Sequence, residues 1–290
     1  MSRSRATLIG GSAILMWSLL ALFTVGTAPV PPLLLNGLTF TLGGALGLIW
    51  TWKAGGFAVL RTVSWKVYAF GTAGLFGYHL FYFSALRMAP AAEAGLIAYL
   101  WPLLIVLFSG LLPGERLTGA HVAGAILAFA GAALIVLKNG GTLSAEALPG
   151  YGFAFLCALT WSSYSVLSRR LGAVPTASVT VFCLTTAALS FAAHFSLETS
   201  AWPVGMAGWL SVLALGLGPV GLAFYTWDVG VKRGDIQLLG TASYAAPLLS
   251  TFVLVGAGIA EPTPRLALAA ILITAGAMLA AKAGARARAA

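Results

Sequence analysis

Apolar stretches about as long as a bilayer is thick fill this sequence from one end to the other. A helix needs about 20 mostly apolar residues to cross the hydrocarbon core of a membrane. Hydrophobic residues make up 60% of the chain and charged residues 8%, whereas a soluble domain has roughly 25% charged residues. The pattern predicts an all-α membrane protein with ten transmembrane helices, at residues 7–27, 31–51, 66–86, 91–112, 118–137, 149–169, 174–196, 205–230, 236–258 and 265–283.

The first apolar stretch has two interpretations. Arg3 and Arg5 precede it, as basic residues precede the core of a secretory signal peptide. The apolar run continues to about Thr27, which is longer than the about 7–15 residues of a signal-peptide core. Similar runs fill the rest of the chain. We therefore expect the first transmembrane helix here.

Basic residues gather on one side of the predicted membrane. With the N terminus in the cytoplasm, thirteen of the 16 Lys and Arg residues fall in cytoplasmic segments, and Arg87, Lys138 and Arg265 fall outside. Lys and Arg are enriched in cytoplasmic loops. We predict a bacterial inner (plasma) membrane protein with both termini in the cytoplasm. The net charge of +9 then reflects the membrane flanks rather than binding of nucleic acid.

The two halves of the chain share a pattern of residues. In order along the halves, the matching positions are Trp17 with Trp161, Phe81-Tyr82 with Phe224-Tyr225, Tyr99 with Tyr244, Pro102 with Pro247, and Gly114-Glu115 with Ala260-Glu261. Each half has an odd number of spans, so the second half is inverted in the membrane, as in secondary transporters. We predict two inverted five-helix repeats, at 1–139 and 148–290, joined by a linker at 140–147.

Polar aromatic side chains occur at depths where the chain otherwise avoids polarity. Tyr78 and Tyr82 lie four residues apart and share one helix face, and Tyr99 lies at a similar depth on the next span. Buried phenol groups need hydrogen-bond partners or water, and an intramembrane histidine such as His79 faces a partner or a cavity. We expect a central aromatic-lined cavity, with these residues as its substrate-binding wall: Trp17, Tyr78, His79, Tyr82, Tyr99, Trp101, Trp161 and Tyr244.

Two prolines lie inside predicted spans. Each of Pro102 and Pro247 removes the backbone hydrogen bond to the residue four positions back and bends its helix, which is compatible with a static kink. Interrupted helices at membrane depth also line cavities. The inverted symmetry predicts one gate from the third and fourth spans and another from the eighth and ninth. We expect Pro102, Tyr225 and Pro247 to be gate or hinge residues.

The ionisable residues offer few sites for chemistry. Asp228 lies near Lys232 at a helix end, and Glu93 opens the fourth span, where a carboxylate favours the helix dipole. The two cysteines, Cys157 and Cys183, lie inside apolar runs without the spacing of metal ligands. The spans contain no HExxH, GxSxG or P-loop motif. We therefore expect a protein that is not an enzyme and has no cofactor and no metal.

Several motifs resemble a known family. The sequences SAL at 84–86, APAAEA at 89–94 and GERLT at 114–118, together with Pro102, resemble the EamA family of the drug/metabolite transporter superfamily. The second half departs from this pattern, because DVG at 228–230 stands where the first half has SAL. The sequences GYH at 77–79 and YLWP at 99–102 resemble the aromatic amino acid exporter subgroup of that family. The resemblance implies two inverted repeats and export of amino acids.

We therefore predict an inner-membrane secondary transporter that exports amino acids, aromatic ones included, by alternating access around the cavity. Its expected partners are an amino acid and the lipid bilayer, with a monomer as the working expectation for its oligomeric state. The alternative is efflux of cationic or drug-like metabolites, because aromatic cavities also hold cations. A membrane receptor or scaffold without transport is a third interpretation.

The sequence says less about which residues bind the charged groups of the substrate and about whether transport is coupled to an ion. The spans place no Arg or Lys at mid-membrane depth, so a zwitterion would use hydroxyl and amide groups such as Ser18, Asn36 and Ser162, with carbonyls freed by the prolines. Small multidrug relatives use a glutamate in the first helix, and this chain has none there. Facilitated efflux and a proton site at His79 or Glu93 both remain open.

Overall fold

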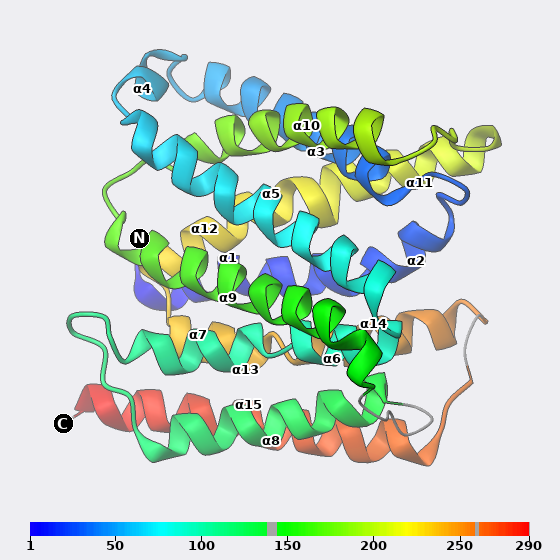
Figure 1. Ribbon diagram of the computed structural model, residues 1–290. Coiled ribbons are helices and arrows are strands. Elements are labelled where there is room, and N and C mark those ends of the chain that lie inside the picture. Colours follow the sequence, from blue (N-terminus) through cyan, green and yellow to red (C-terminus); the bar gives the residue numbers. More distant parts are fainter. Residues whose placement is uncertain (138–143, 259–260, 290) are drawn as a thin grey trace.

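The chain folds into a helical bundle. The computed structural model describes residues 1–137, 144–258 and 261–289, and every regular element in these ranges is helical. The longer helices run across the bundle, so the connections gather at its two ends (Figure 1). Both termini and the short helix α4 lie at the left end in Figure 1, which we call the N-terminal end, and the opposite end is the distal end.

The helices follow one another in two groups. The first group comprises α1 (Arg3–Ser18), α2 (Leu20–Val25), α3 (Pro32–Lys53), α4 (Ala58–Arg61), α5 (Trp65–Met88), α6 (Ala91–Ala98), α7 (Trp101–Ser109) and α8 (Gly119–Val136). The second comprises the 3₁₀ helix η1 (Ala145–Ala147), α9 (Leu148–Arg170), α10 (Ser178–Leu197), α11 (Gly205–Leu217), the π-helix η2 (Gly218–Leu222), α12 (Ala223–Arg233), α13 (Ile236–Ala242), α14 (Ala245–Gly256) and α15 (Pro264–Ala289).

Local sequence explains where several of these helices begin. Pro32 occupies the first turn of α3 and Pro149 that of α9, where the missing N–H costs nothing because the first N–H groups of a helix have no intrahelical partner. Ser64 caps α5 by accepting a hydrogen bond from the backbone N–H of Lys66 at 3.3 Å. Asp235 caps α13 in the same way, from Leu238 N at 3.0 Å.

Four of the stretches that the sequence predicts as single spans are interrupted. The first breaks at Leu19, the eighth contains η2, and the fourth and ninth break at residues 99–100 and 243–244. In the fourth and ninth, the break lies just before Pro102 and Pro247, because a proline cannot supply the N–H that would continue the preceding helix. The expected interruption at each proline is therefore present, as a break between two helices rather than a bend in one.

The polar connections also contain short helices. The segment from Lys53 to Ser64, expected to be a loop, contains α4. The predicted linker at 140–147 contains η1 in its second half, whereas its residues 140–143 lie outside the described residues, as does Lys138.

Length and composition identify six membrane-spanning candidates within the described residues. They are Arg3–Val25, Pro32–Lys53, Ser178–Leu197, Gly205–Arg233, Ile236–Gly256 and Pro264–Arg286, and two shorter apolar helices cover Glu93–Ser109 and Gly119–Ile135. Helices α5 and α9 do not meet this criterion. They carry histidine, tyrosine, serine and terminal arginine residues, which lower hydropathy, and they pack against each other in the middle of the molecule (Figure 1).

Helices of the first group pack mainly on helices of the second. The pairs are α1 with α12, α3 with α10, α5 with α9, α7 with α13, and α8 with α15. Glycine permits the closest of these contacts: a Cβ on Gly10 would lie 2.7 Å from the Cα of Gly230, and a Cβ on Gly124 would lie 2.6 Å from the carbonyl oxygen of Gly276. Small residues let helix backbones approach where lipid provides no hydrophobic drive for association.

Candidate functional site

Four tryptophans form the centre of the largest hydrophobic cluster. Trp17 comes from α1, Trp101 from the start of α7, Trp161 from α9 and Trp227 from α12. The ring centroids of all six pairs lie 5.1–6.4 Å apart, mostly in edge-to-face or tilted arrangements. We call these four residues the tryptophan cage. Two of them come from each half of the chain.

Hydrogen bonds fix two of the cage rings. Trp17 donates from Nε1 to the carbonyl oxygen of Pro219 at 3.1 Å, and Trp227 donates from Nε1 to Ser165 Oγ at 3.0 Å. Pro219 lies in the π-helix η2, and π-bulges inside α-helices occur frequently at functional sites. The cage is therefore oriented partly by an irregular turn of the helix that leads into α12.

A tyrosine wall approaches the cage from α5. The rings of Tyr78 and Tyr82 are stacked, with centroids 6.1 Å apart and planes 2° apart, and Tyr78 lies 5.5 Å from Trp161. Tyr78, Tyr82 and Trp17 are half-buried, whereas Trp161 is only 3% exposed. The half-buried rings thus lie at the edge of the aromatic cluster, and Trp161 lies in its interior.

His79 lies beside the cage rather than within it. Its ring packs edge-on to Phe40, with centroids 5.1 Å apart, and lies 6.3 Å from Phe224. Its Nδ1 lies 2.7 Å from the carbonyl oxygen of Leu75, one turn back on α5. A carbonyl can only accept a hydrogen bond, so Nδ1 carries the proton and Nε2 is the acceptor of the neutral ring. The polar partner expected for His79 is thus a backbone group of its own helix.

Tyr244 lies in a different cluster from the cage. It is fully buried with Ala128, Leu248 and Ile273 on the side of α8 and α15. Its hydroxyl accepts a hydrogen bond from the backbone N–H of Leu103 at 3.0 Å. Leu103 is in the first turn of α7, whose N–H groups lack intrahelical partners. Tyr244 therefore caps α7 across the break in that span, and Tyr99, half-buried, packs against the same cluster.

The expected gate residues are buried. The Tyr225 hydroxyl donates to the carbonyl oxygen of Gly43 at 3.0 Å, and its ring lies edge-on to Trp50 at 5.9 Å. This contact attaches α12 to α3. Pro102 and Pro247 are buried in the first turns of α7 and α14.

The polar groups proposed for the charged ends of a substrate already have partners. Asn36 Nδ2 donates to Ser190 Oγ at 2.7 Å between α3 and α10, and Ser18 and Ser162 donate to carbonyl oxygens of their own helices. Hydroxyl-to-carbonyl bonds of this kind are common where serine lies within a helix. Asn36 is therefore a contact between helices, not a part of the cage.

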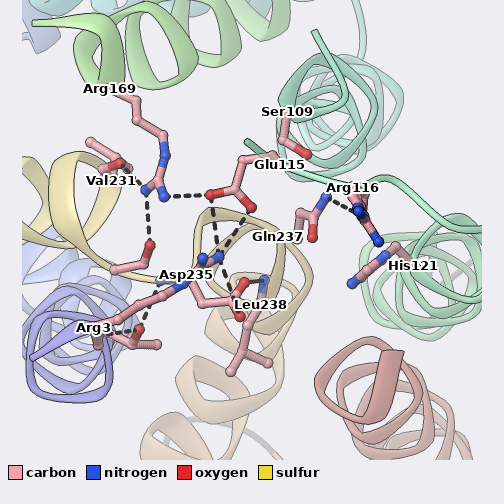
Figure 2. A network of polar contacts seen from close by, with 12 residues as sticks. Arg3, Ser109, Glu115, Arg116, His121, Arg169, Val231, Asp235, Gln237 and Leu238 are labelled. Atoms are coloured by element: carbon pink, nitrogen blue, oxygen red, sulfur yellow. Dashed lines mark hydrogen bonds and ion pairs between the residues drawn. The ribbon is translucent and has the colours of Figure 1, made fainter. Parts of the chain in front are cut away.

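Two buried carboxylates organise the two ends of the bundle. At the N-terminal end, Arg3, Glu115, Arg169 and Asp235 form a network that we call the Glu115 cluster (Figure 2). At the distal end, Glu198 accepts from the backbone N–H groups of Leu33 and Leu34, from Arg87 at 2.5 Å, and contacts His194 Nδ1 at 2.9 Å.

The Asp228–Lys232 pair and a pocket at the N-terminal end lie outside the cage. Asp228 is paired with Lys232 at 2.8 Å, as expected from their four-residue spacing, and both side chains are buried. The described residues contain no group of three or more His, Cys, Asp or Glu side chains that could hold a metal. A pocket of about 190 Å³ lies at the N-terminal end, between the end of α3 and the start of α10, lined by Trp50, Gly56 and Thr176 among others.

Trp227 is the principal cage residue that sequence analysis missed. The residues at the corresponding place in the first half are Phe83 and Ser84, and neither is a tryptophan, so the repeat gives no signal for it. Its position two residues after Tyr225, inside an apolar span, is the one clue in the sequence. The packing of α12 against α9 brings it into the cage.

Comparison with known proteins gives consistent matches over nearly the whole chain. The model of the EamA-like transporter family matches residues 5–137 and again residues 148–281. An aromatic amino acid exporter, YddG, from Ancylobacter novellus is 59% identical over 283 residues, which cover 97% of this chain and 98% of that protein. The protein of the same name from Escherichia coli is 27% identical over 87% of this chain and 88% of its own length.

A solved structure has the same fold. A crystal structure of a protein 58% identical to this chain superposes with a TM-score of 0.94 and covers 98% of this chain and 99% of the other. The resemblance that the motifs at 77–79, 84–86, 89–94, 99–102 and 114–118 indicate is therefore confirmed over nearly the whole chain.

Proposed function

This chain belongs to the EamA-like transporter family, and on that basis we propose that it exports aromatic amino acids across the bacterial inner membrane, with the tryptophan cage as the substrate site. Family membership and the exporters among its relatives indicate a membrane transporter of amino acids, not an enzyme. The single observation that carries the assignment of the site is the convergence of four tryptophans from both halves of the chain.

The chemistry of the cage suits an aromatic or aliphatic side chain. Aromatic rings prefer edge-to-face or offset contacts with one another, worth about 0.5–1.5 kcal/mol for each pair beyond the area that they bury. A substrate ring that enters the cage replaces contacts between protein rings with similar contacts of its own. Net binding should therefore be weak, which suits an exporter whose substrate accumulates in the cytoplasm.

Ten spans in two inverted repeats are the architecture that best accounts for the helices. The family model matches each half separately, and the helices pair across the halves in an order consistent with a two-fold relation, α1 with α12 and α5 with α9. In this architecture α5 and α9 are also spans, and their lower hydropathy reflects the site residues that they carry. We propose that the N-terminal end, with its many basic residues, faces the cytoplasm.

We propose that transport proceeds by alternating access, and the unequal burial of the two ends supports this proposal. Tyr225 and Trp227, on the span that reaches the N-terminal end after them, are buried, whereas Tyr78 and Tyr82, on the distal part of α5, are half-buried. The burial pattern supports a conformation that is closed towards the cytoplasm. The export cycle requires the reverse conformation, in which α12 and α13 separate from α1 and α7.

Radiolabelled flux in liposomes tests this proposal. Purified protein should release labelled phenylalanine or tryptophan from vesicles faster than vesicles without protein, and Trp161→Phe should slow the release more than Trp209→Phe, which alters an exposed ring far from the cage. A run with an imposed pH gradient separates proton-coupled from facilitated export. Absence of amino acid flux from vesicles that contain correctly folded protein would contradict the proposal.

Efflux of a cation is the second candidate, and the cage is the observation that favours it. Tryptophan faces are the best aromatic partners for organic cations. A cation would bind to the rings rather than to a carboxylate, because Asp228 and Glu115 already pair with basic side chains. Labelled tetraphenylphosphonium in the same vesicles distinguishes the two candidates. Cation flux without amino acid flux would favour the second.

A further inference from the structure

The GERLT motif at 114–118 has no role in the tryptophan cage. Its glutamate, Glu115, lies in the connection between α7 and α8, yet its side chain is only 5% exposed. A carboxylate that is withdrawn from water needs charged or hydrogen-bonding partners, because an unpaired buried charge is very costly. The partners of Glu115 show what the motif does.

Arg169 joins three segments at once. It extends from the end of α9, and its Nη1 donates to the carbonyl oxygens of Val231 and Gly234 at 3.0 and 2.8 Å, at the end of α12. Its Nη2 donates to Glu115 Oε1. The planar guanidinium has five N–H donors in a fixed geometry, so one side chain can hold all three acceptors in place, as Figure 2 shows.

Arg3 adds the first helix to the same cluster. Its Nη2 lies 3.0 Å from Glu115 Oε2 and 3.8 Å from Asp235 Oδ2. Thr7, one turn further along α1, accepts a hydrogen bond from the backbone N–H of Asp235 at 2.8 Å. The cluster thus joins α1 and the α7–α8 connection, from the first half, to α9 and the α12–α13 junction, from the second half.

The matching position in the second half is different. Glu261, the counterpart of Glu115 in the repeat, is exposed. The buried carboxylate of the distal end, Glu198, instead joins α3, α5 and α10, and none of these carries a cage tryptophan. Of the two clusters, the Glu115 cluster at the N-terminal end is therefore the one that joins helices with cage tryptophans from both halves of the chain.

We propose that the Glu115 cluster is a latch that holds the cytoplasmic side of the transporter shut and must release in every export cycle. This inference rests on the proposed function, because it assigns the cluster to the conformational change of transport. The two arginines and two carboxylates depend on one another, since loss of one member leaves a buried partner unpaired. The cluster therefore opens as a unit. Glu115 and Arg169 act through the position of α12, so they are positioning residues.

The two native cysteines provide reporters on opposite sides of the cage. Cys183 is fully buried and faces the hydroxyl of Tyr225, on α12. Cys157 is also buried and faces Tyr78, on α5. Buried thiols react slowly with thiol reagents. Labelling of Cys183 in the Cys157→Ala background therefore reports movement of α12, and labelling of Cys157 in the Cys183→Ala background reports movement of α5.

The test compares Glu115→Gln with Glu261→Gln in liposomes of defined orientation. Loss of the latch should favour the state open to the cytoplasm, so the KM of Glu115→Gln for phenylalanine should fall at the cytoplasmic face and rise at the outer face, on the order of tenfold. Cys183 should label about tenfold faster, and Cys157 more slowly. Arg169→Lys, which keeps the charge but loses the planar set of donors, should give a smaller shift in the same direction. Glu261→Gln should behave as the wild type.

Several results would overturn the latch. They are an unchanged rate of Cys183 labelling in both Glu115→Gln and Arg169→Lys, an equal change of KM at both faces, or the same shift in Glu261→Gln. If Glu115→Gln does not fold, Arg169→Lys and Arg3→Gln carry the same comparison. Wild-type protein that moves no amino acid would contradict the proposed function, whereas cysteine labelling needs no substrate and would still decide whether the latch exists.

Discussion

Tyr99 and Tyr244 occupy matching places in the two halves, each three residues before a proline at a helix break, yet their surroundings differ. Tyr244 is fully buried, and its hydroxyl caps α7 through Leu103. Tyr99 is half-buried and packs against the same hydrophobic cluster as Tyr244. The repeat therefore determines where each tyrosine lies along its span, whereas the conformation of the whole bundle determines which of the two is fully buried.

The spans that carry Tyr82 and Tyr225 show the same contrast. Helix α5 is regular throughout, but the corresponding stretch before Tyr225 contains the π-helix η2. The carbonyl oxygen of Pro219 in η2 accepts the hydrogen bond from the Trp17 indole. One half thus supplies a straight wall and the other an irregular turn that orients the cage.

The largest expected effect is at the centre of the cage. Trp161→Ala removes a ring that contacts the other three cage tryptophans and Tyr78, and we expect a loss of about 3–5 kcal/mol in the free energy of unfolding. Trp209→Ala, at a ring that is 46% exposed, should change stability by at most about 0.5 kcal/mol. Thermal unfolding in detergent measures both, and equal losses would show that the cage has no special packing.

A smaller effect should distinguish the π-helix from the straight helix. A Cβ on Gly221 would clash with the backbone carbonyl of Gly216, whereas a Cβ on Gly77 would make an ordinary contact with Thr160 at 3.5 Å. We expect Gly221→Ala to cost about 3 kcal/mol, the upper part of the range for overpacking, and Gly77→Ala to be tolerated. Midpoints of thermal unfolding test the pair, and a tolerated Gly221→Ala would show that η2 can relax without cost.

The smallest effect should separate the two tyrosines. Tyr244→Phe leaves the buried N–H of Leu103 without its acceptor, which should cost about 1–2 kcal/mol of stability. Tyr99→Phe should change stability little, because Tyr99 is only half-buried, and we expect it to alter transport kinetics instead, because Tyr99 belongs to the predicted substrate-binding wall. Unfolding midpoints and flux rates for both variants measure this contrast. Equal stability losses would mean that both sides are packed alike.

Sequence reasoning named three of the four cage tryptophans because depth in a span can be counted along the chain. Trp17, Trp101 and Trp161 fall near the middle of their spans, and the structure brings the three together. The interruptions before Pro102 and Pro247 follow from the missing N–H of proline. These features depend on local chemistry and length, which a sequence contains.

Other parts depend on which helices meet, and the sequence does not contain that information directly. The inverted repeat predicts Tyr244 in the cavity wall, whereas in the structure α7 packs against α13, and the hydroxyl of Tyr244, which follows α13, caps α7. Asn36 has the polarity of a substrate ligand, and contact between α3 and α10 pairs it with Ser190. Glu115 resembles a surface end group until the folded chain brings Arg3 and Arg169 to it.

The position of a bound substrate tests the central claim most directly. A crystal of the protein soaked with 4-iodophenylalanine would show the iodine by anomalous scattering. Our account predicts an iodine peak in van der Waals contact with Trp17, Trp101 and Trp161, beneath the stacked rings of Tyr78 and Tyr82. A peak at the pocket beside Trp50 and Thr176, or none at saturating ligand, would contradict the assignment of the tryptophan cage as the substrate site.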